Sequence, residues 1–359
     1  MKLLITCPFG LWSLLAQELK RLWFVPEETF QTWTFLTTDT KGMMKINYLS
    51  RLANKVYIQL ATWEAKTFDE LFNIVKHSDF SQFSSNTNIS LKVEIKNSIL
   101  SSTRTVQSVT HKAILENIAH FWKEETYTEE LLLINTNNHV TLYINTSWKA
   151  LYQRGYKKYN WEAPIKENLA TALLLLSWRK FKSPLYDPFC WSWTLAIEAA
   201  LLAKNKAPWS RRHFNFEHFK NYEKTYFETL KLQAKEKEFS WTYTIIASDI
   251  SEESIKNAQE NAKIAGVEND IQFKVQDFLS YNIPNNDKAW IITNPPYGKR
   301  ITSNNLWKLY AHLEQSFSTR IYWWRISSLQ RLSYDAKKRS QKKLFNWADE
   351  CHFYRKKPN

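Results

Sequence analysis

From Ala163 onward, patterns typical of a β-strand alternate with patterns typical of an α-helix. The strand-like runs are "PLYDPFC", "TYTIIASD", "IQFKVQDF" and "AWIITNPPYG", and the helix-like runs "LAIEAALLAK" and "SEESIKNAQENAKIAG" lie between them. Such alternation places successive strands side by side and mostly parallel, with helices on the faces of the sheet. The sequence therefore predicts a doubly wound α/β domain over residues 163–359.

The first 162 residues lack this alternation and predict smaller α+β units. Residues 1–58 are expected to hold a strand, "KLLITC", an amphipathic helix from Leu11 to Leu22, and two short strands, followed by a helix containing "INYLSRLANKVYIQLA". Residues 59–150 begin with the helical "TFDELFNIVKHSDF", continue with the alternating "ISLKVEIKNS" and close with the strand "HVTLYINTS". Residues 151–162 are basic and turn-rich, which is typical of a linker.

Charge and cysteine usage restrict the class of protein. The chain has 49 Lys and Arg against 35 Asp and Glu, a formal net charge of +14, which favours an anionic partner such as nucleic acid. The three cysteines are too few and too scattered for a disulfide scaffold or a zinc cluster. No apolar run reaches the roughly 20 residues of a membrane span. We therefore expect a cytoplasmic protein without a bound metal, and the sequence gives no indication of oligomeric state.

Residues that follow the predicted strands are the ones to examine for a ligand site, because open α/β sheets bind ligands at the carboxyl ends of their strands. Asp249 ends "IIASD" and is placed to accept hydrogen bonds from a ribose diol, although it could equally cap the next helix, as could Ser251. Asp277 could accept from an adenine amino group while Phe278 packs on the ring.

The run Asn294 to Gly298, "NPPYG", is the most specific of these features. Two consecutive prolines fix the backbone and leave a rigid turn whose carbonyls point in a set direction. Asn294 adds a side-chain carbonyl and Tyr297 an aromatic face. Together they predict a socket for a planar group bearing an amine, which would donate to the oxygens of Asn294 and Pro295.

Glycine and tryptophan occur in unusual proportions. About 7% of an average chain is glycine, which here would be roughly 25 residues, yet the chain has 5 Gly and 17 Trp. Several tryptophans fall where glycine is favoured: Trp23 and Trp178 follow predicted helices, and Asn346-Trp347 joins two predicted strands. A single one, such as Trp122, is better explained as a core or base-stacking residue. For the set, we hypothesise that many are encoded by UGA and read as glycine in the cell.

Two stretches of the sequence together resemble motifs of a known family. Asp187 to Thr194, "DPFCWSWT", resembles the Asp-Pro-x-Cys-Gly-Ser-Gly-Thr loop, and "NPPYG" the amine-binding motif, of class I S-adenosylmethionine-dependent methyltransferases. The runs "RGYKKYNWEAPIKENLA" and "APWSRRHFNFEHF" are similar to THUMP-containing RNA methyltransferases, above all the 23S rRNA guanine-N2 methyltransferases of the large-subunit L type in their short form. "TRTVQSVTHKAI" resembles the THUMP signature, so the likeness covers essentially the whole chain.

This resemblance implies the fold, the site and the partner. Residues 1–58 would be ferredoxin-like, residues 59–150 a THUMP domain, and residues 163–359 a Rossmann-like methyltransferase domain. S-adenosylmethionine would bind Asp187, Phe189, Cys190, Trp191, Ser192, Trp193, Thr194, Asp249, Ile250, Asp277, Phe278 and Asn294. The catalytic set would be Asn294, Pro295, Pro296 and Tyr297. Ribosomal RNA or its precursor particle would contact Arg104, Lys112, Arg154, Lys157 and Lys158.

The resemblance also bears on the tryptophans. In the family, glycine is expected at the positions of Trp12, Trp148, Trp161, Trp191, Trp193, Trp209, Trp323 and Trp324. The hypothesis of recoded glycine therefore predicts an obstructed cofactor loop when Trp191 and Trp193 are present as written.

Two other functions stay open from the residues. The amine socket does not distinguish guanine from adenine, so an adenine-N6 methyltransferase is one alternative, although a DNA-reading module is not recognisable. A non-catalytic RNA-binding protein is the other, and it follows if Trp191 and Trp193 are genuine.

Overall fold

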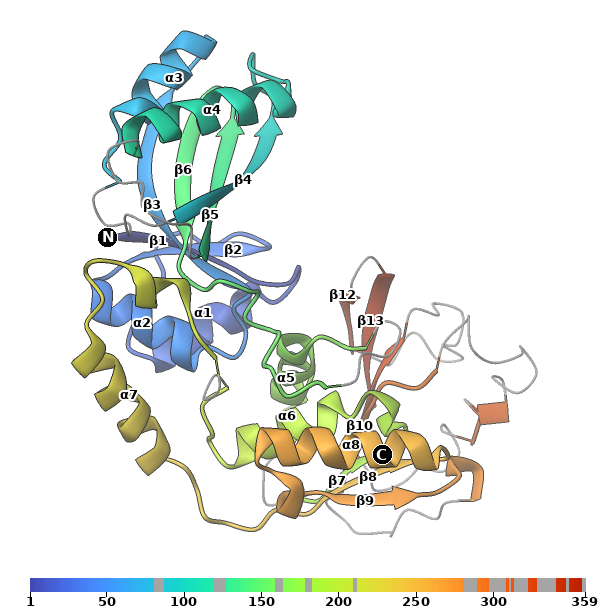
Figure 1. The fold of residues 1–359 in the computed structure, drawn as a ribbon. Coiled ribbons are helices and arrows are strands. Elements are labelled where there is room, and N and C mark those ends of the chain that lie inside the picture. Colours follow the sequence, from blue (N-terminus) through green and yellow to red (C-terminus); the bar gives the residue numbers. More distant parts are fainter. Residues whose placement is uncertain are drawn as a thin grey trace. The chain divides into compact units, whose positions relative to one another are not determined.

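The structure, a computed structural model, describes residues 1–80, 87–118, 127–158, 164–177, 183–208, 212–280, 289–296, 308–309, 311–312, 322–327, 340–346 and 349–356. The chain divides into two compact units: residues 1–7, 16–151 and 212–231 form the first, and residues 8–15, 152–211 and 232–359 the second. The predicted α/β fold class is confirmed (Figure 1). No helix of these described ranges is long and apolar enough to cross a membrane.

The first unit is built on one six-stranded sheet. Its strand order is β2 (Trp33–Thr37), β1 (Lys2–Thr6), β3 (Lys55–Glu64), β6 (His139–Asn145), β5 (Tyr127–Thr136), β4 (Thr87–Lys96). Strands β4 and β5 are parallel and the other neighbours antiparallel. The boundary expected between residues 58 and 59 lies inside β3, so the two expected N-terminal parts share a continuous sheet. The helix expected to contain residues 46–61 is wrong in its second half: the observed helix ends at Leu49, and residues 55–64 form β3 because their apolar side chains are used in pairing with β1 and β6.

Four helices precede or connect these strands. They are α1 (Trp12–Arg21), α2 (Thr40–Leu49), α3 (Phe68–Lys76) and α4 (Thr103–Ile118). Helix α3 begins at a capping box, in which Thr67 accepts from the backbone of Glu70 and Glu70 accepts from the backbone of Thr67. Helices α3 and α4 lie against each other, and α4 contacts β4 (Figure 1).

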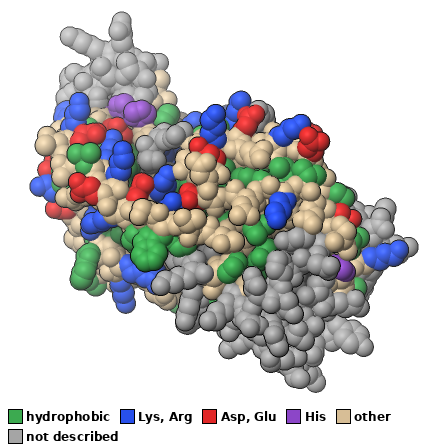
Figure 2. All heavy atoms as spheres, turned by 90° about the horizontal axis from the view of Figure 1, so that it is seen from below, with side chains coloured by type: hydrophobic (Ala, Val, Ile, Leu, Met, Phe, Trp, Pro, Cys, Tyr) green, Lys and Arg blue, Asp and Glu red, His purple; other side chains and the backbone are tan. Residues whose placement is uncertain are grey.

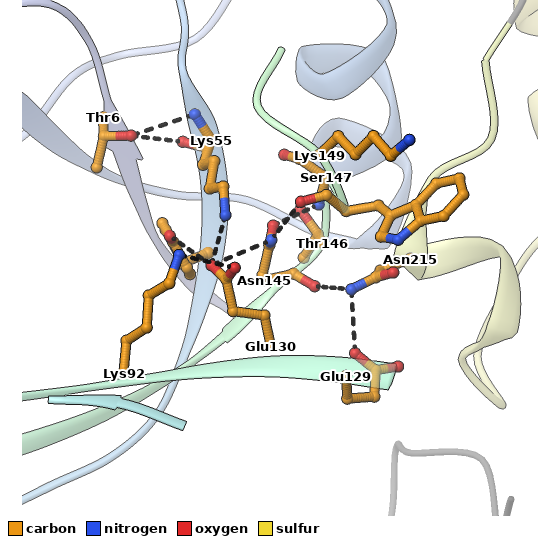
Figure 3. A network of polar contacts seen from close by, with 12 residues as sticks. Thr6, Lys55, Lys92, Glu129, Glu130, Asn145, Thr146, Ser147, Lys149 and Asn215 are labelled. Atoms are coloured by element: carbon orange, nitrogen blue, oxygen red, sulfur yellow. Dashed lines mark hydrogen bonds and ion pairs between the residues drawn. The ribbon is translucent and has the colours of Figure 1, made fainter. Parts of the chain in front are cut away.

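A carboxylate on β5 links four strands of this sheet (Figure 3). Glu130 accepts hydrogen bonds from Lys55 at 2.5 Å, Lys92 at 3.0 Å and the hydroxyl of Tyr57 at 3.1 Å. Asn145 on β6 donates to the same carboxylate at 3.5 Å. Burial works to raise the pKa of Glu130, but the two lysines outweigh it and the pKa is lowered. Among the described residues, the carboxylate of Glu130 is therefore charged and is paired with side chains of the same sheet.

Residues 212–231, here called the strap, pack in the first unit although the chain enters and leaves them through the second. Arg212 donates to the carbonyl of Ala150 at 3.0 Å, and Asn215 donates to Glu129 and to the carbonyl of Asn145 (Figure 3). The rings of Phe214, Phe216, Phe219 and Phe227 are buried, and Phe227 packs edge-on against Tyr48 of α2. The strap also carries the first two turns of α7 (Lys224–Glu236).

The second unit holds a seven-stranded sheet with the order β12 (Ser340–Asn346), β13 (Asp349–Lys356), β11 (Tyr322–Ser327), β10 (Trp290–Thr293), β7 (Leu185–Asp187), β8 (Ile245–Asp249), β9 (Gln272–Val275). Strands β9, β8, β7, β10 and β11 run parallel, and β13 is antiparallel to both its neighbours. The helices α5 (Glu167–Leu176), α6 (Thr194–Ala203) and α8 (Glu252–Ala265) alternate with these strands. The predicted doubly wound sheet is thus confirmed.

The predicted hairpin near the end of the chain is also present. Strands β12 and β13 pair as far as Asn346 and Asp349. Trp347 lies outside the described residues, as do Trp122, Trp161, Trp178 and Trp209.

Candidate functional site

The loop between β7 and α6 begins at a buried carboxylate. Asp187 accepts from the hydroxyl of Thr293, at the end of the neighbouring β10, at 2.7 Å, and from the backbone of Phe189 at 3.4 Å. Burial raises the pKa of Asp187 to about 7, against the two hydrogen bonds, which lower it. This carboxylate therefore ties the loop to the strand that carries the Asn-Pro-Pro run.

The loop then passes through a short 3-10 helix, Cys190–Ser192, into α6. Trp193 joins the two in the left-handed conformation, with φ 41° and ψ −9°, and its side chain is 1% exposed. Thr194 begins α6 and is buried, as is Cys190. The half-buried Trp191 donates from its indole nitrogen to the backbone carbonyl of Asn294 at 3.0 Å. The loop therefore forms the expected strand-turn-helix connection, but indoles lie at two positions where glycine was expected.

Asp249, at the end of β8, reaches the same loop. Burial raises the pKa of Asp249, although hydrogen bonds from the backbones of Ser251, Trp191 and Ile250 lower it. Ser251 is the residue that caps α8, since its hydroxyl accepts from Ser254 at 3.2 Å. Of the two capping candidates the structure thus selects Ser251, and Asp249 instead receives backbone donors from the turn. Ile250 is exposed.

The turn after β9 adds an aromatic wall. Phe278 is buried, with its ring centroid 4.8 Å from that of Phe189. Asp277 is exposed and accepts from the backbone of Leu279 at 3.0 Å. The turns that follow β7 and β9 therefore meet through Phe189 and Phe278, as expected for the carboxyl edge of a parallel sheet.

Asn294 follows β10 and is 1% exposed. Neither its amide oxygen nor its amide nitrogen has a hydrogen-bond partner within the part of the chain that the structure describes. Buried polar atoms are nearly always paired, so an orphaned amide indicates a place where something else binds. Pro295 is buried and Pro296 half-buried. Tyr297 lies outside the described residues, and so does the side chain of Ser192.

These groups suit the cofactor and the amine that the sequence predicted. Asp249 can accept hydrogen bonds from hydroxyl groups, and Phe278 offers an aromatic ring. Asn294 offers an amide that has no hydrogen-bond partner among the described residues. Trp191 does not suit a cofactor loop, because its indole lies against the backbone of Asn294 at a position where glycine was expected. Sequence reasoning missed Thr293, whose hydroxyl fixes Asp187; a threonine at the end of an apolar strand, one residue before the motif, was the available signal.

The residues expected to contact RNA lie in different settings. Arg104 and Lys112 are exposed, and the ammonium of Lys112 lies 5.7 Å from the centroid of the Phe72 ring. Lys158 is exposed and pairs with Glu260 at 3.3 Å. On the face drawn in Figure 2, basic side chains are interspersed with acidic ones.

Arg154 and Lys157 are in contrast used inside the protein. Arg154 is 3% exposed, and its guanidinium donates to both carboxylate oxygens of Glu198 on α6, at 3.1 and 3.2 Å. Glu198 also accepts from Tyr156 at 3.1 Å and Thr171 at 2.7 Å. Lys157 pairs with the buried Glu167 at 3.2 Å. This burial is at odds with phosphate contacts by Arg154 and Lys157, because both cations already have carboxylate partners.

Comparisons with known proteins agree with this geometry. The family described as "RMKL-like, methyltransferase domain" matches residues 154–342, and the "RlmL ferredoxin-like domain" matches residues 2–57. "Putative RNA methyltransferase YpsC" of Bacillus subtilis is 32% identical over 98% of this chain and 94% of its own length. "Ribosomal RNA large subunit methyltransferase K/L" of Shewanella baltica is 29% identical over 96% of this chain. The chain spans about half of that longer protein, 51% of its length.

A solved structure extends the likeness to three dimensions. The crystal structure of a possible methylase from Clostridium difficile 630 superposes with a TM-score of 0.91 and 32% identity, covering 100% of this chain and 98% of that one. The ferredoxin-like start and the S-adenosylmethionine-dependent methyltransferase domain predicted from the sequence are thereby confirmed. Since one family description covers more than half of its residues, the chain belongs to the RMKL-like methyltransferases.

Proposed function

We propose that this protein methylates the exocyclic N2 amine of a guanine in 23S ribosomal RNA. The observation that carries the proposal is the buried amide of Asn294, which has no partner among the described residues and follows β10 beside two prolines. The names of the relatives support RNA as the substrate: YpsC is described as an RNA methyltransferase, and the Shewanella protein as a ribosomal RNA large subunit methyltransferase.

The residues around the β7 and β8 turns would hold the cofactor. Asp249 would accept from the ribose hydroxyls, and Phe278 with Asp277 would lie at the adenine, while the loop Asp187–Thr194 would pass beside the rest of the molecule. Bound S-adenosylmethionine supplies an electrophilic methyl group. The protein would hold the backbones of these turns in place. The hydrogen bond from Thr293 to Asp187 links the turn after β10 to the turn after β7.

Asn294 and Pro295 would orient the guanine. The amine donates its two hydrogens to the amide oxygen of Asn294 and the carbonyl of Pro295, and these bonds localise on nitrogen a lone pair that is otherwise delocalised into the ring. The base must leave its helix to reach such a socket, as in other enzymes that modify bases. Tyr297 would stack on the extruded ring. Catalysis then comes mainly from positioning.

The first unit would dock the RNA. Arg104 and Lys112 of this unit, together with Lys158 of the second unit, are the retained candidates for phosphate contacts, because all three are exposed. Phosphate contacts of this kind give affinity without sequence choice and weaken as salt is raised.

The test is methyl transfer to ribosomal RNA, followed by mass spectrometry of the nucleosides. We expect N2-methylguanosine in 23S RNA, and its loss in Asn294→Ala but not in Asn73→Ala, a matched change at an exposed asparagine of α3. N6-methyladenosine as the product would refute the proposal in favour of the adenine alternative. Methylation of duplex DNA instead of RNA would refute it as well.

A further inference from the structure

Three tryptophans have backbone conformations that L-residues with large side chains rarely adopt. Trp23, Trp148 and Trp193 have φ values of 70°, 65° and 41°. In the part of the chain that the structure describes, the other residues at positive φ are either glycine or asparagine. Glycine has no Cβ to clash there, and asparagine is the side chain that tolerates this region best. Tryptophan has neither advantage.

Trp23 ends α1 in a geometry that the chain also builds with glycine. The backbone of Trp23 donates to the carbonyl of Lys20 at 3.0 Å, and that of Phe24 to Leu19 at 2.9 Å. At the end of α8, Gly266 donates to Lys263 at 3.0 Å, and Val267 to Ala262 at 2.9 Å, with φ 68° at Gly266. Both are Schellman motifs with the left-handed residue at C′, the position at which glycine is the usual choice. The indole of Trp23 is 90% exposed, so burial does not offset the strain.

Trp148 repeats this pattern in a turn. Its carbonyl accepts from the side chain of Asn145 at 2.8 Å, which fixes the backbone, while its indole is 47% exposed. The backbone therefore has a conformation that favours glycine, and the side chain is exposed instead of packed in a core.

Trp193 and Trp191 lie in the cofactor loop itself. Trp193 is left-handed at the start of α6, where Ile197 donates to its carbonyl at 3.1 Å. Trp191 places its indole on the carbonyl of Asn294. A loop that must pass close to a ligand needs its backbone bare at such positions.

We propose that the protein made in its own cells carries glycine at positions 23, 148, 191 and 193, through a UGA codon read as glycine, and tryptophan at position 290. Trp290 is the contrasting case: it lies in β10 with a buried side chain and pairs with Leu185 and Tyr322. Backbone conformation thus separates Trp23, Trp148 and Trp193 from Trp290, and Trp191 joins the first group through its place in the cofactor loop. The proposal goes beyond the methylation function and does not depend on which base is the substrate.

The deciding experiment is mass spectrometry of peptides from the protein purified out of its native cells, together with the codons of its gene. We expect glycine and TGA at positions 23, 148, 191 and 193, and tryptophan and TGG at position 290. Tryptophan in the peptides that contain positions 23, 148 and 193 would overturn the proposal. Glycine at position 290 would overturn the separation by backbone conformation.

Recombinant variants provide a second measurement. Trp23→Gly should raise the melting temperature above that of Trp23→Ala, because only glycine removes the left-handed strain. In the matched motif, Gly266→Ala should lower it, and Trp290→Gly should lower it through lost packing. A melting temperature for Trp23→Gly at or below that of Trp23→Ala contradicts the inference.

Calorimetry separates this inference from the methylation proposal. The double variant Trp191→Gly/Trp193→Gly should bind S-adenosylmethionine at least about tenfold more tightly than the chain as written, a change of about 1.4 kcal/mol. Should it fail to bind while native peptides carry glycine, the methylation function would be refuted and the glycine assignment upheld.

Discussion

Glu198 on α6 and Asn294 after β10 are both buried polar side chains of the second unit, but they differ in their hydrogen-bond partners. Glu198 accepts from Arg154, Tyr156 and Thr171. Asn294 has no side-chain partner among the described residues. Protein interiors leave few polar groups unpaired, so the first arrangement is typical of structure and the second of a ligand site. Hydrogen-bond partners therefore distinguish these two residues, which burial alone does not.

The largest expected effect tests the satisfied group. Glu198→Ala leaves the buried guanidinium of Arg154 without its counter-charge, so the free energy of unfolding should fall by about 4 kcal/mol. Chemical denaturation measures this, with Glu253→Ala on the exposed face of α8 as the control. An unchanged midpoint for Glu198→Ala would mean that the cluster does not hold the structure together.

The second effect concerns the pH dependence conferred by Asp187. Its pKa is raised by burial from 3.8 to about 7, so folding favours the protonated form. That contribution, at most about 4 kcal/mol, is fully present below about pH 4 and is lost as the pH rises through 7. Asp187→Asn, which cannot ionise, should show a flatter profile of unfolding free energy against pH. Identical profiles for the two proteins would contradict the raised pKa.

The unsatisfied group should respond in the opposite direction. Asn294→Leu removes two unpaired polar atoms from a buried site, so thermal unfolding should show a stability unchanged or raised by about 1 kcal/mol. Methyl transfer should meanwhile fall by about a hundredfold or more. A loss of stability as large as that of Glu198→Ala would show that Asn294 is a structural residue, and the comparison would fail.

The smallest effect is expected at the surface. Lys158 and Glu260 are both more than half-exposed, so Lys158→Ala should change stability by no more than about 1 kcal/mol. If Lys158 contacts phosphate, the same change should lower RNA affinity and reduce the salt slope by about 1. An unaltered salt slope would remove Lys158 from the interface.

The strand ends and their turns were predictable from the sequence because they combine a hydrophobic period with turn chemistry. Asp187, Asp249, Phe278 and Asn294 all lie at the carboxyl ends of parallel strands, as the alternation of patterns implied. The family motif indicated the loop Asp187–Thr194. The excess of tryptophan over glycine in the composition drew attention to Trp191 and Trp193 within it.

Other features could not be predicted, since they depend on contacts between distant residues. In the sequence, Arg154 is indistinguishable from any basic residue of a linker. In the structure it is buried and forms an ion pair with Glu198 of α6. The choice between Asp249 and Ser251 as helix cap required the actual turn. The packing of the strap in the first unit could not be predicted either, because its aromatic residues suit any core.

The strap has a consequence for how the two units can be inherited or separated. Cutting the chain after position 151 separates the first sheet from the rest of the chain. Residues 212–231 then remain with the methyltransferase domain and lose the sheet and helix that bury Phe214, Phe216 and Phe227. A gene fragment of that kind would produce an exposed aromatic surface, which promotes aggregation. The strap therefore couples the folding of the two units: a fragment that ends at position 151 lacks part of the core of the first unit, and a fragment that begins there carries aromatic residues without their partners.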